Sequence, residues 1–257
     1  MPPITNPLAV HIQTLKRRLI VIGATILVSM MVAFAFSAEM VAWLNRPFPN
    51  PLVFYGPTEA LFASIKVSFL AAVLASLPVV FYQLWKFVQP ALLPQEQRWG
   101  IPLILIAGGL FALGLVFCNL VILPLVIDFF VSFGMDRDIT PELSVGTYID
   151  FNVKFLLTFG CAFELPLLLS VLARLGVVSA HQLAKYRKHA VLSALIISAV
   201  ITPDATLFTM MLMAVPLMVL YEIGIIGARL FGRGRADDVD LPMDPDLPIR
   251  TAGHRVR

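Results

Sequence analysis

Long apolar stretches separated by short polar segments dominate this chain of 257 residues. An α-helix needs roughly 20 apolar residues to cross a bilayer core of about 30 Å. Stretches of about that length occupy 19–38, 67–88, 101–123 and 151–172, and two shorter ones occupy 190–201 and 207–221. A polar turn, Thr-Pro-Asp-Ala-Thr at 202–206, separates the last two and predicts a helical hairpin. The pattern predicts an all-α integral membrane protein with six transmembrane helices, of which the last two are short.

The last hairpin and the prolines predict helices that are short or kinked. The helix predicted at 190–201 would reach only about 18 Å at 1.5 Å per residue, so either flanking residues extend it or the bilayer thins around it. Because proline removes a backbone hydrogen bond, it predicts kinks in or beside the spans. The prolines concerned are Pro78, Pro102, Pro124, Pro166 and Pro216.

The distribution of basic residues predicts the topology. The segment before the first span and the segment after the fourth carry Lys and Arg without acids, whereas the segment after the third span is rich in acids. Since Lys and Arg collect on the cytoplasmic side, we expect both termini to be cytoplasmic in a multi-pass protein of the plasma membrane. The apolar run 19–36 is longer than the 7–15 residues of a secretory signal, so we expect an uncleaved first helix.

These assignments divide the chain into three parts. Residues 1–18 form a cytoplasmic amphipathic segment, 19–230 a six-helix membrane domain, and 231–257 a proline-broken charged tail that we expect to be disordered. The segments after the first and third spans contain aromatic residues that favour the membrane interface. We expect these aromatic residues, which are Trp43, Phe48, Phe129, Phe130 and Phe133, to form caps outside the helices.

Composition narrows the range of functions. Hydrophobic residues make up 59% and charged residues 14%, which excludes an ordinary soluble domain. A net charge of +3 follows from topology, so no nucleic-acid partner is expected. Cys118 and Cys161 lie in apolar spans without ligand spacing, which predicts buried free thiols. No phosphate-binding loop, dinucleotide fingerprint or His-Glu-x-x-His pair occurs, so we expect no enzyme activity, cofactor or metal.

Glu164 is the most informative single residue, because a carboxyl group in mid-span is costly and usually faces a cavity or a partner. One alternative is a structural role, with a protonated Glu164 hydrogen-bonded to a neighbouring helix, for example to Gln83. Another is a proton-coupled small-solute transporter in which Glu164 carries the proton. A third is a passive scaffold for other membrane subunits, in which Glu164→Gln would be silent.

Several short motifs follow one another along the chain. They are His-Ile-Gln-Thr-Leu-Lys-Arg-Arg-Leu at 11–19, Tyr-Gln-Leu-Trp-Lys-Phe-Val-Gln-Pro-Ala-Leu at 82–92, Glu96 and Arg98 in the next polar loop, Phe-Gly-Cys-Ala-Phe-Glu-Leu-Pro at 159–166, and the hairpin at 202–224. In this order they resemble the motifs of the TatC family, the multispanning receptor of the twin-arginine protein translocase. The first three stretches are similar to the family's His-Leu-x-Glu-Leu-Arg-x-Arg-Leu opening, its Tyr-Gln-x-Trp-x-Phe-x-x-Pro-Gly/Ala-Leu stretch and the polar loop that follows, and 159–166 to its Phe-Gly-x-x-Phe-Glu-x-Pro signature. The resemblance covers about 6–230.

The resemblance implies a receptor and core subunit that binds the twin-arginine signal peptides of folded proteins and exports them with the protonmotive force. It implies TatA- and TatB-type single-span partners, contact with membrane lipid and self-association. Glu96 is the expected arginine ligand, since a carboxylate grips guanidinium bidentately. The other implied signal-peptide residues are His11, Lys16, Arg18, Tyr82, Phe87, Pro90 and Leu92, while Gln83 and Glu164 form an intramembrane polar site, and Pro47 and Asp204 belong to the external loop and hairpin.

The opening motif departs from the family at two positions. Thr14 stands where the family has an acidic residue, and Lys16 stands where it has arginine. The resemblance implies two acidic sites for arginine recognition, so this chain has one of them. We therefore expect weaker selectivity for paired arginines or compensation by a second family member in the same cell.

Overall fold

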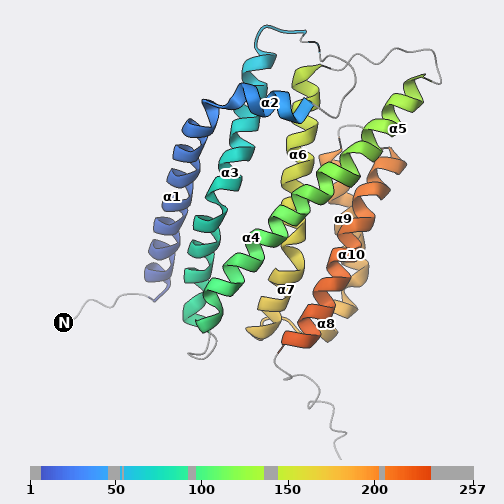
Figure 1. Cartoon of the computed structure of the whole chain (residues 1–257). Coiled ribbons are helices and arrows are strands. Elements are labelled where there is room, and N and C mark those ends of the chain that lie inside the picture. The colour runs from blue at the N-terminus through green and yellow to red at the C-terminus, as the bar shows by residue number, and fades with distance from the viewer. Residues whose placement is uncertain are drawn as a thin grey trace, which may run out of the picture.

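The structure is a computed structural model that describes residues 7–45, 53, 55–91, 97–135, 144–202 and 206–232. Within these ranges the side chains of 7–12, 45, 91, 99 and 135 are not described. The described residues are almost entirely helical, and the helices stand side by side as a curved wall (Figure 1). This confirms the predicted all-α fold.

The first half of the wall consists of long helices joined by short ones. The long helix α1 (Pro7–Phe34) is followed by the short α2 (Ser37–Asn45), which crosses the end of α3 (Glu59–Val88) (Figure 1). Two 3₁₀ turns, η1 (Gln89–Ala91) and η2 (Gln97–Trp99), lead to α4 (Gly100–Phe117). A π-helical turn, η3 (Cys118–Ile122), joins α4 to α5 (Leu123–Met135) in one continuous diagonal helix.

The second half is broken into shorter pieces. Helix α6 (Val145–Phe163) ends at Glu164 and α7 (Leu165–Arg174) begins directly after it. Helix α8 (Ala180–Lys185) begins at a capping box in which Ser179 and Gln182 satisfy each other's backbone N–H groups, and α9 (Arg187–Ile201) and α10 (Leu207–Phe231) follow. The structure thus places a helix break at Glu164, beside the predicted Pro166 kink.

The core lies around α6, which packs against α3 and α4, while α10 packs against α7 and α9. The largest fully buried side chains include Phe155, Phe159 and Ile149 of α6, which meet Val126 of α5 and Met213 of α10. Helix α1 packs on α3 and leaves most of its apolar side chains exposed, as expected for a surface that faces lipid. The buried apolar side chains therefore lie mainly around α6, and most of those on α1 stay exposed.

Several predicted boundaries were wrong. The third apolar span belongs to a 35-residue helix, Gly100–Gly134, so Phe129, Phe130 and Phe133 are helical rather than in a loop. Trp43 likewise lies in α2. The place of these rings at the membrane interface stays a prediction. Helix α10 has 25 residues, so the last helix is not short; its apolar pattern continues past Tyr221, and the sequence-based boundary ended it too early.

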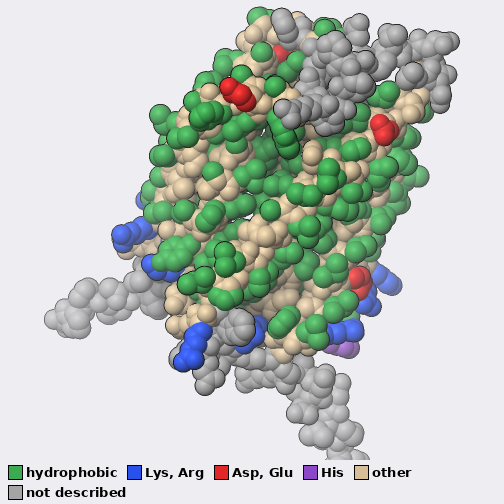
Figure 2. Space-filling view, in the orientation of Figure 1, with side chains coloured by type: hydrophobic (Ala, Val, Ile, Leu, Met, Phe, Trp, Pro, Cys, Tyr) green, Lys and Arg blue, Asp and Glu red, His purple; other side chains and the backbone are tan. Residues whose placement is uncertain are grey.

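Within the described residues, five helices are long and apolar enough to cross a membrane. The remaining one, α9, has 15 residues and spans about 22 Å, so the count of six crossings and the local thinning of the bilayer stay predictions. The start of α1 and the end of α10 lie at the same end of the molecule (Figure 1). Lys and Arg side chains gather at that end (Figure 2), which we call the basic end. Its membrane side stays a prediction, as do the domain limits; the predicted tail is outside the described residues.

Candidate functional site

At the basic end, the side chain of Arg18 links α1 to α3. Its guanidinium Nη1 donates a hydrogen bond of 3.0 Å to the carbonyl oxygen of Gln83 and lies 5.9 Å from the ring centre of Phe87. Arg18 is partly buried between the two helices, whereas Lys16 is exposed. Arg18 therefore has a structural role that its position in a basic run did not indicate. His11 lies in α1, in the part whose side chains are not described.

An exposed aromatic surface flanks this contact at the end of α3. Tyr82 is 47% exposed and Phe87 is 42% exposed, and the Lys86 ammonium lies 5.2 Å from the ring centre of Tyr82. Pro90 follows in η1 and is also exposed. The predicted residues Tyr82, Phe87 and Pro90 thus lie on one accessible stretch of α3 and η1, where an apolar peptide segment could bind.

The loop that contains Glu96 is closed at its base. The Gln89 side chain donates to Oε1 of Gln97 at 3.4 Å, and the Gln97 amide donates back to the Gln89 carbonyl at 3.5 Å. The indole of Trp85 lies against Gly100, where any side chain would collide with it. These contacts hold the two ends of the loop together. Leu92 and Glu96, both predicted to bind the signal peptide, lie outside the described residues.

Glu164 lies at the junction of α6 and α7. Its backbone N–H bonds to the Cys161 carbonyl at 3.2 Å, closing the last turn of α6, and Pro166 at the second position of α7 is suited to a helix start. The side-chain oxygen Oε1 is buried and has no hydrogen-bond partner among the described residues. A buried acceptor without a partner in a membrane-spanning segment is costly, so this carboxyl group is available to an external ligand.

Rigid aromatic packing surrounds this junction. Gly160 lies against the ring of Phe111 on α4, and the Phe117 ring is 5.5 Å from that of Phe163. No hydrogen bond joins Gln83 to Glu164 in the described part of the chain, so the predicted contact between them is not observed. The two residues therefore do not form a directly bonded polar pair.

An ion pair between α9 and α10 lies at the basic end, and the sequence did not reveal it. Arg187 donates to both carboxylate oxygens of Glu222, at 2.7 and 2.8 Å. The Tyr221 hydroxyl donates to the Leu183 carbonyl at 2.9 Å. Arg187 therefore positions the hairpin as well as adding basic charge, and only its proximity to Glu222 across 35 residues in the fold shows this.

At the opposite end, Glu59 joins two segments that are distant in sequence. Its Oε2 accepts the Ser144 hydroxyl at 2.8 Å and the Tyr55 N–H at 3.3 Å, and the Val145 N–H bonds to the Val53 carbonyl at 2.9 Å. The start of α3 is thus connected to the start of α6. Pro47 and Asp204, the predicted external residues, lie outside the described ranges.

A second charged cluster lies within the spans, between α3 and α6. Asp150 pairs with Lys66 at 2.9 Å and with Lys154 at 3.0 Å. The opposite charges of these three residues near two helix ends were the available sequence signal. The cluster satisfies its own charges, unlike Glu164.

The described residues give no support for a metal site or for a disulfide. The described residues contain no group of three His, Cys, Asp or Glu side chains that could hold a metal ion. Both cysteines are free, as predicted, and Cys118 is buried. The prediction that Cys161 is also buried was wrong: it lies on the exposed face at the end of α6.

Comparison with known proteins gives consistent results. The family model described as "Sec-independent protein translocase protein (TatC)" matches residues 10–216. The TatC of Aquifex aeolicus (strain VF5) is 39% identical over 237 residues, covering 90% of this chain and 98% of that protein. The TatC of Desulforapulum autotrophicum is 37% identical over 239 residues, covering 91% and 88%.

Solved structures agree with the fold as well. A crystal structure of the twin-arginine translocase receptor TatC superimposes with a TM-score of 0.79 at 39% identity, covering 87% of this chain and 100% of that chain. A second structure of the receptor, in the detergent DDM, gives a TM-score of 0.78 at 40% identity. Together with five helices that can cross a bilayer, these matches show that the chain is a multi-pass inner-membrane protein that belongs to the TatC family.

Proposed function

We propose that this protein is the receptor and core subunit of a twin-arginine translocase, which binds the signal peptides of folded proteins and exports them with the protonmotive force. The match to TatC over 10–216 carries this proposal, because it includes the segments at the basic end and the Glu164 junction. The relatives give no support to the alternative of a proton-coupled small-solute transporter.

The arginine pair of the signal peptide binds at the basic end, which is the cytoplasmic side. Glu96 supplies the carboxylate, since two parallel N–H···O bonds to a guanidinium give both energy and geometric selectivity. The exposed rings of Tyr82 and Phe87 take apolar side chains beside the arginines. Support comes from the Gln89–Gln97 contact, which holds the ends of the Glu96 loop next to this aromatic surface.

Glu164 binds the later part of the signal peptide or the transmembrane helix of a TatA- or TatB-type subunit. Its buried Oε1 lacks an internal partner and sits where the α6–α7 break interrupts the regular backbone. A hydroxyl, amide or guanidinium from a second helix would satisfy it, and a hydrogen bond formed away from water discriminates strongly against apolar partners.

Photo-crosslinking in membranes tests the receptor role. A probe placed next to the arginines of a model signal peptide should crosslink near Glu96, and the crosslink should be lost in Glu96→Ala and with a Lys-Lys signal. Glu39→Gln, which removes a carboxylate at the opposite end, serves as the matched control and should not change the yield. Equal yields from Arg-Arg and Lys-Lys signals would contradict the assignment.

The substitution of Thr14 for the family's acidic residue can be tested in the same cells. We expect Thr14→Glu to raise the ratio of Arg-Arg to Lys-Lys export, because it restores a second carboxylate near the start of α1. Both signals are attached to one reporter protein, and its transported fraction is measured. An unchanged ratio would show that Glu96 alone sets the selectivity or that a second family member contributes.

A further inference from the structure

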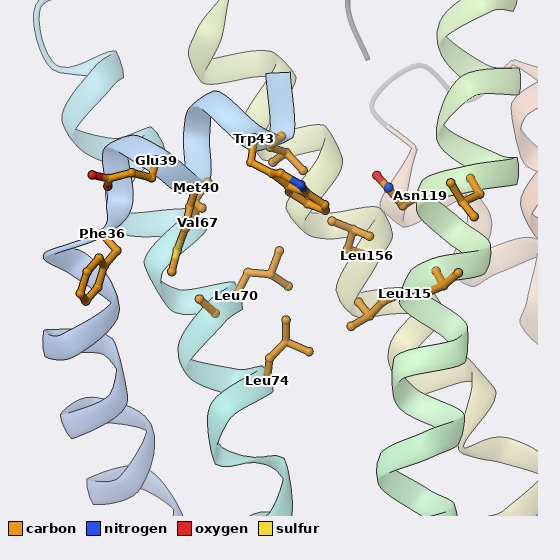
Figure 3. A pocket seen from close by; sticks show the side chains of 14 residues that line it. Phe36, Glu39, Met40, Trp43, Val67, Leu70, Leu74, Leu115, Asn119 and Leu156 are labelled. Atoms are coloured by element: carbon orange, nitrogen blue, oxygen red, sulfur yellow. The ribbon is translucent and has the colours of Figure 1, made fainter. Parts of the chain in front are cut away.

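Two sides of helix α6 differ in their chemistry. On one side, Leu156 faces an apolar groove between α2, α3 and α4, which Leu70 and Leu115 also line (Figure 3). On the other side, two residues before Leu156, the side chain of Lys154 is exposed. Residues two apart on an α-helix point roughly 200° away from each other. The groove therefore suits apolar contacts, whereas the opposite side of α6 carries charge within a membrane-spanning helix.

The side of α6 opposite the groove carries a row of polar residues, which we call the polar stripe. Its members are four, four, three and three residues apart, so they lie within roughly a third of the helix circumference. Two of them are exposed and three are partly exposed. The polar stripe consists of Asp150, Lys154, Thr158, Cys161 and Glu164.

The polar stripe differs from a surface that faces lipid. The exposed side of α1, for comparison, carries apolar side chains such as Leu27, Val28 and Met31, which are 62%, 61% and 72% exposed. Lipid tails cannot satisfy a charge or a carboxyl oxygen, and ionisable groups in membrane-spanning segments usually face a cavity or a partner. A second polar surface is therefore expected against this side of α6.

The polar stripe is positively charged at the end of the molecule opposite the basic end. Asp150 pairs with Lys66 of α3 at 2.9 Å and with Lys154 at 3.0 Å, so each ammonium group has a carboxylate oxygen. Two cations share one anion, however, and the three charges sum to +1. The Lys66 side chain is 38% exposed and that of Lys154 is 54% exposed. A second carboxylate can therefore reach both ammonium groups and neutralise the remaining charge.

The other end of the polar stripe offers a hydrogen-bond acceptor. Oε1 of Glu164 is buried and has no hydrogen-bond partner among the described residues. Glu164 follows Lys154 by ten residues, which corresponds to about 15 Å along α6. The stripe thus presents a site for an anion and a site for a hydrogen-bond donor at a fixed separation.

A single transmembrane helix can satisfy both sites. A phospholipid can place its phosphate at the lysines, but its acyl chains carry no donor for Glu164, and the apolar core of a signal peptide carries no acid. A helix with an acid near one end and a hydroxyl or amide side chain eleven residues further in presents both on one side, about 16 Å apart. Thr158 and Cys161 lie between the two sites, and their small side chains let a second helix approach closely.

We infer that the polar stripe binds the transmembrane helix of a single-span subunit. The acid of that helix lies between Lys66 and Lys154, and its hydrogen-bond donor lies at Glu164. This inference rests on the proposed function, in which the translocase has single-span subunits. It adds the side of α6 that binds the subunit, the sign of the charge and the spacing of the two groups on the bound helix.

A designed helix tests this surface in cell membranes that contain the full-length chain. The probe is a Leu/Ala helix of about 24 residues with lysines at its cytoplasmic end, which fix its orientation, a Glu near the other end and an Asn eleven residues further in. A photoreactive amino acid replaces Cys161 or, as a control, Val28 on the apolar side of α1. From position 161, this probe should crosslink at least fivefold more than one with Leu at both polar positions. From position 28, the two probes should give equal yields.

Reversing the charge separates binding from a structural effect. In the unmodified background, a probe with Lys in place of Glu should crosslink at least fivefold less, and equal yields would overturn the inference. Lys154→Glu changes the sum of the cluster from +1 to −1, so it should reverse this preference, whereas a folding defect would lower both yields. Lys185→Glu, which alters an exposed lysine at the basic end, should leave the preference unchanged.

The spacing of the two sites has its own readout. Moving the Asn of the probe by two residues turns it to the opposite side of the helix, so the yield should fall to that of a probe with Glu alone. Glu164→Leu should have the same effect on the original probe. Equal yields at both spacings, or crosslinks from position 161 to phospholipid alone, would overturn the inference.

A parallel measurement distinguishes failure of this inference from failure of the proposed function. The crosslink between an Arg-Arg signal peptide and the region of Glu96 is recorded in the same membranes. If that crosslink forms while the designed helix does not bind, the inference about the polar stripe is wrong and the receptor role stands. If the designed helix binds while the signal peptide does not crosslink, the proposed receptor role is wrong instead.

Discussion

Two charged sites lie within the membrane-spanning helices, and they differ in whether the chain satisfies them. Between α3 and α6, Asp150 accepts from both Lys66 and Lys154, so each charge has a partner in the same chain. At the α6–α7 junction, Oε1 of Glu164 is buried and has no partner in the described residues. A charge that is paired internally contributes to the fold, whereas an unsatisfied one requires an explanation outside it.

The comparison also separates structural from functional sequence signals. Sequence alone singled out Glu164 because it is an isolated acid in a long apolar run, and it did not pair Lys66 with Asp150. In the fold, the cluster at the helix ends joins α3 to α6 by ion pairs, whereas Oε1 of the isolated acid has no hydrogen-bond partner among the described residues. The charge that lacks a partner is the better candidate for binding.

The largest effect of a substitution is expected at Glu164, and it is an effect on export. Glu164→Gln keeps the size of the side chain but removes the carboxylate, so the export rate of a twin-arginine reporter should fall at least tenfold, which corresponds to about 1.4 kcal/mol of activation free energy. The melting temperature of the purified protein should change little, because Oε1 of Glu164 has no hydrogen-bond partner among the described residues. Export is measured in cells whose only TatC is the variant.

Cys161→Ser is the control for this prediction, since Cys161 is exposed one turn before Glu164. It should export at the normal rate. If Glu164→Gln also exports normally, the carboxylate is not a binding group and a scaffold role is favoured. If Glu164→Gln lowers the melting temperature instead, the residue is structural and the contrast with Asp150 fails.

The paired cluster should show the reverse pattern. Asp150→Asn leaves Lys66 and Lys154 close together without their shared anion, so the free energy of unfolding should fall by roughly 1–2 kcal/mol, between the values for exposed and buried pairs. Thermal unfolding in detergent measures it. Signal-peptide crosslinking at the basic end should not change in the folded fraction.

An apolar replacement sharpens this result. The triple variant Lys66→Met, Asp150→Leu, Lys154→Met removes all three charges and should recover most of the lost stability, since apolar side chains suit the spanning region. If Asp150→Asn unfolds at the same temperature as the unmodified chain, the two ion pairs contribute nothing measurable. Failure of the triple variant to recover stability would point to a need for the charges themselves.

The smallest effect is expected at the ion pair between Arg187 and Glu222, which lies outside the apolar part of the wall. Arg187→Lys keeps the charge but loses the two-bond geometry, so it should lower the melting temperature only slightly, and the difference should shrink as salt is raised. Melting temperatures at low and high salt measure it. A cost as large as that of Asp150→Asn would show that the hairpin depends on this pair.

The sequence determined the fold class, the principal spans and the family. Apolar length alone identifies helices that cross a membrane, because unsatisfied backbone groups cannot face lipid and every span must therefore be helical. The ordered motifs around 11–19, 82–92 and 159–166 identified the TatC family, which the comparisons confirmed. Glu164 could also be identified from the sequence, because an acidic residue in an apolar run is visible there directly.

Only the tertiary structure decided where helices begin, bend and meet. The predicted third span ended near 123 and the last near 221, although apolar residues follow both points, and the observed helices α5 and α10 continue past them through backbone hydrogen bonding. The pairing of Arg18 with Gln83 and of Arg187 with Glu222 joins residues 65 and 35 positions apart. The π-helical turn at Cys118–Ile122 is equally invisible in the pattern, since one such turn depends on how neighbouring helices pack. Composition fixes which segments enter the membrane, while packing between helices fixes which polar groups are left for a partner.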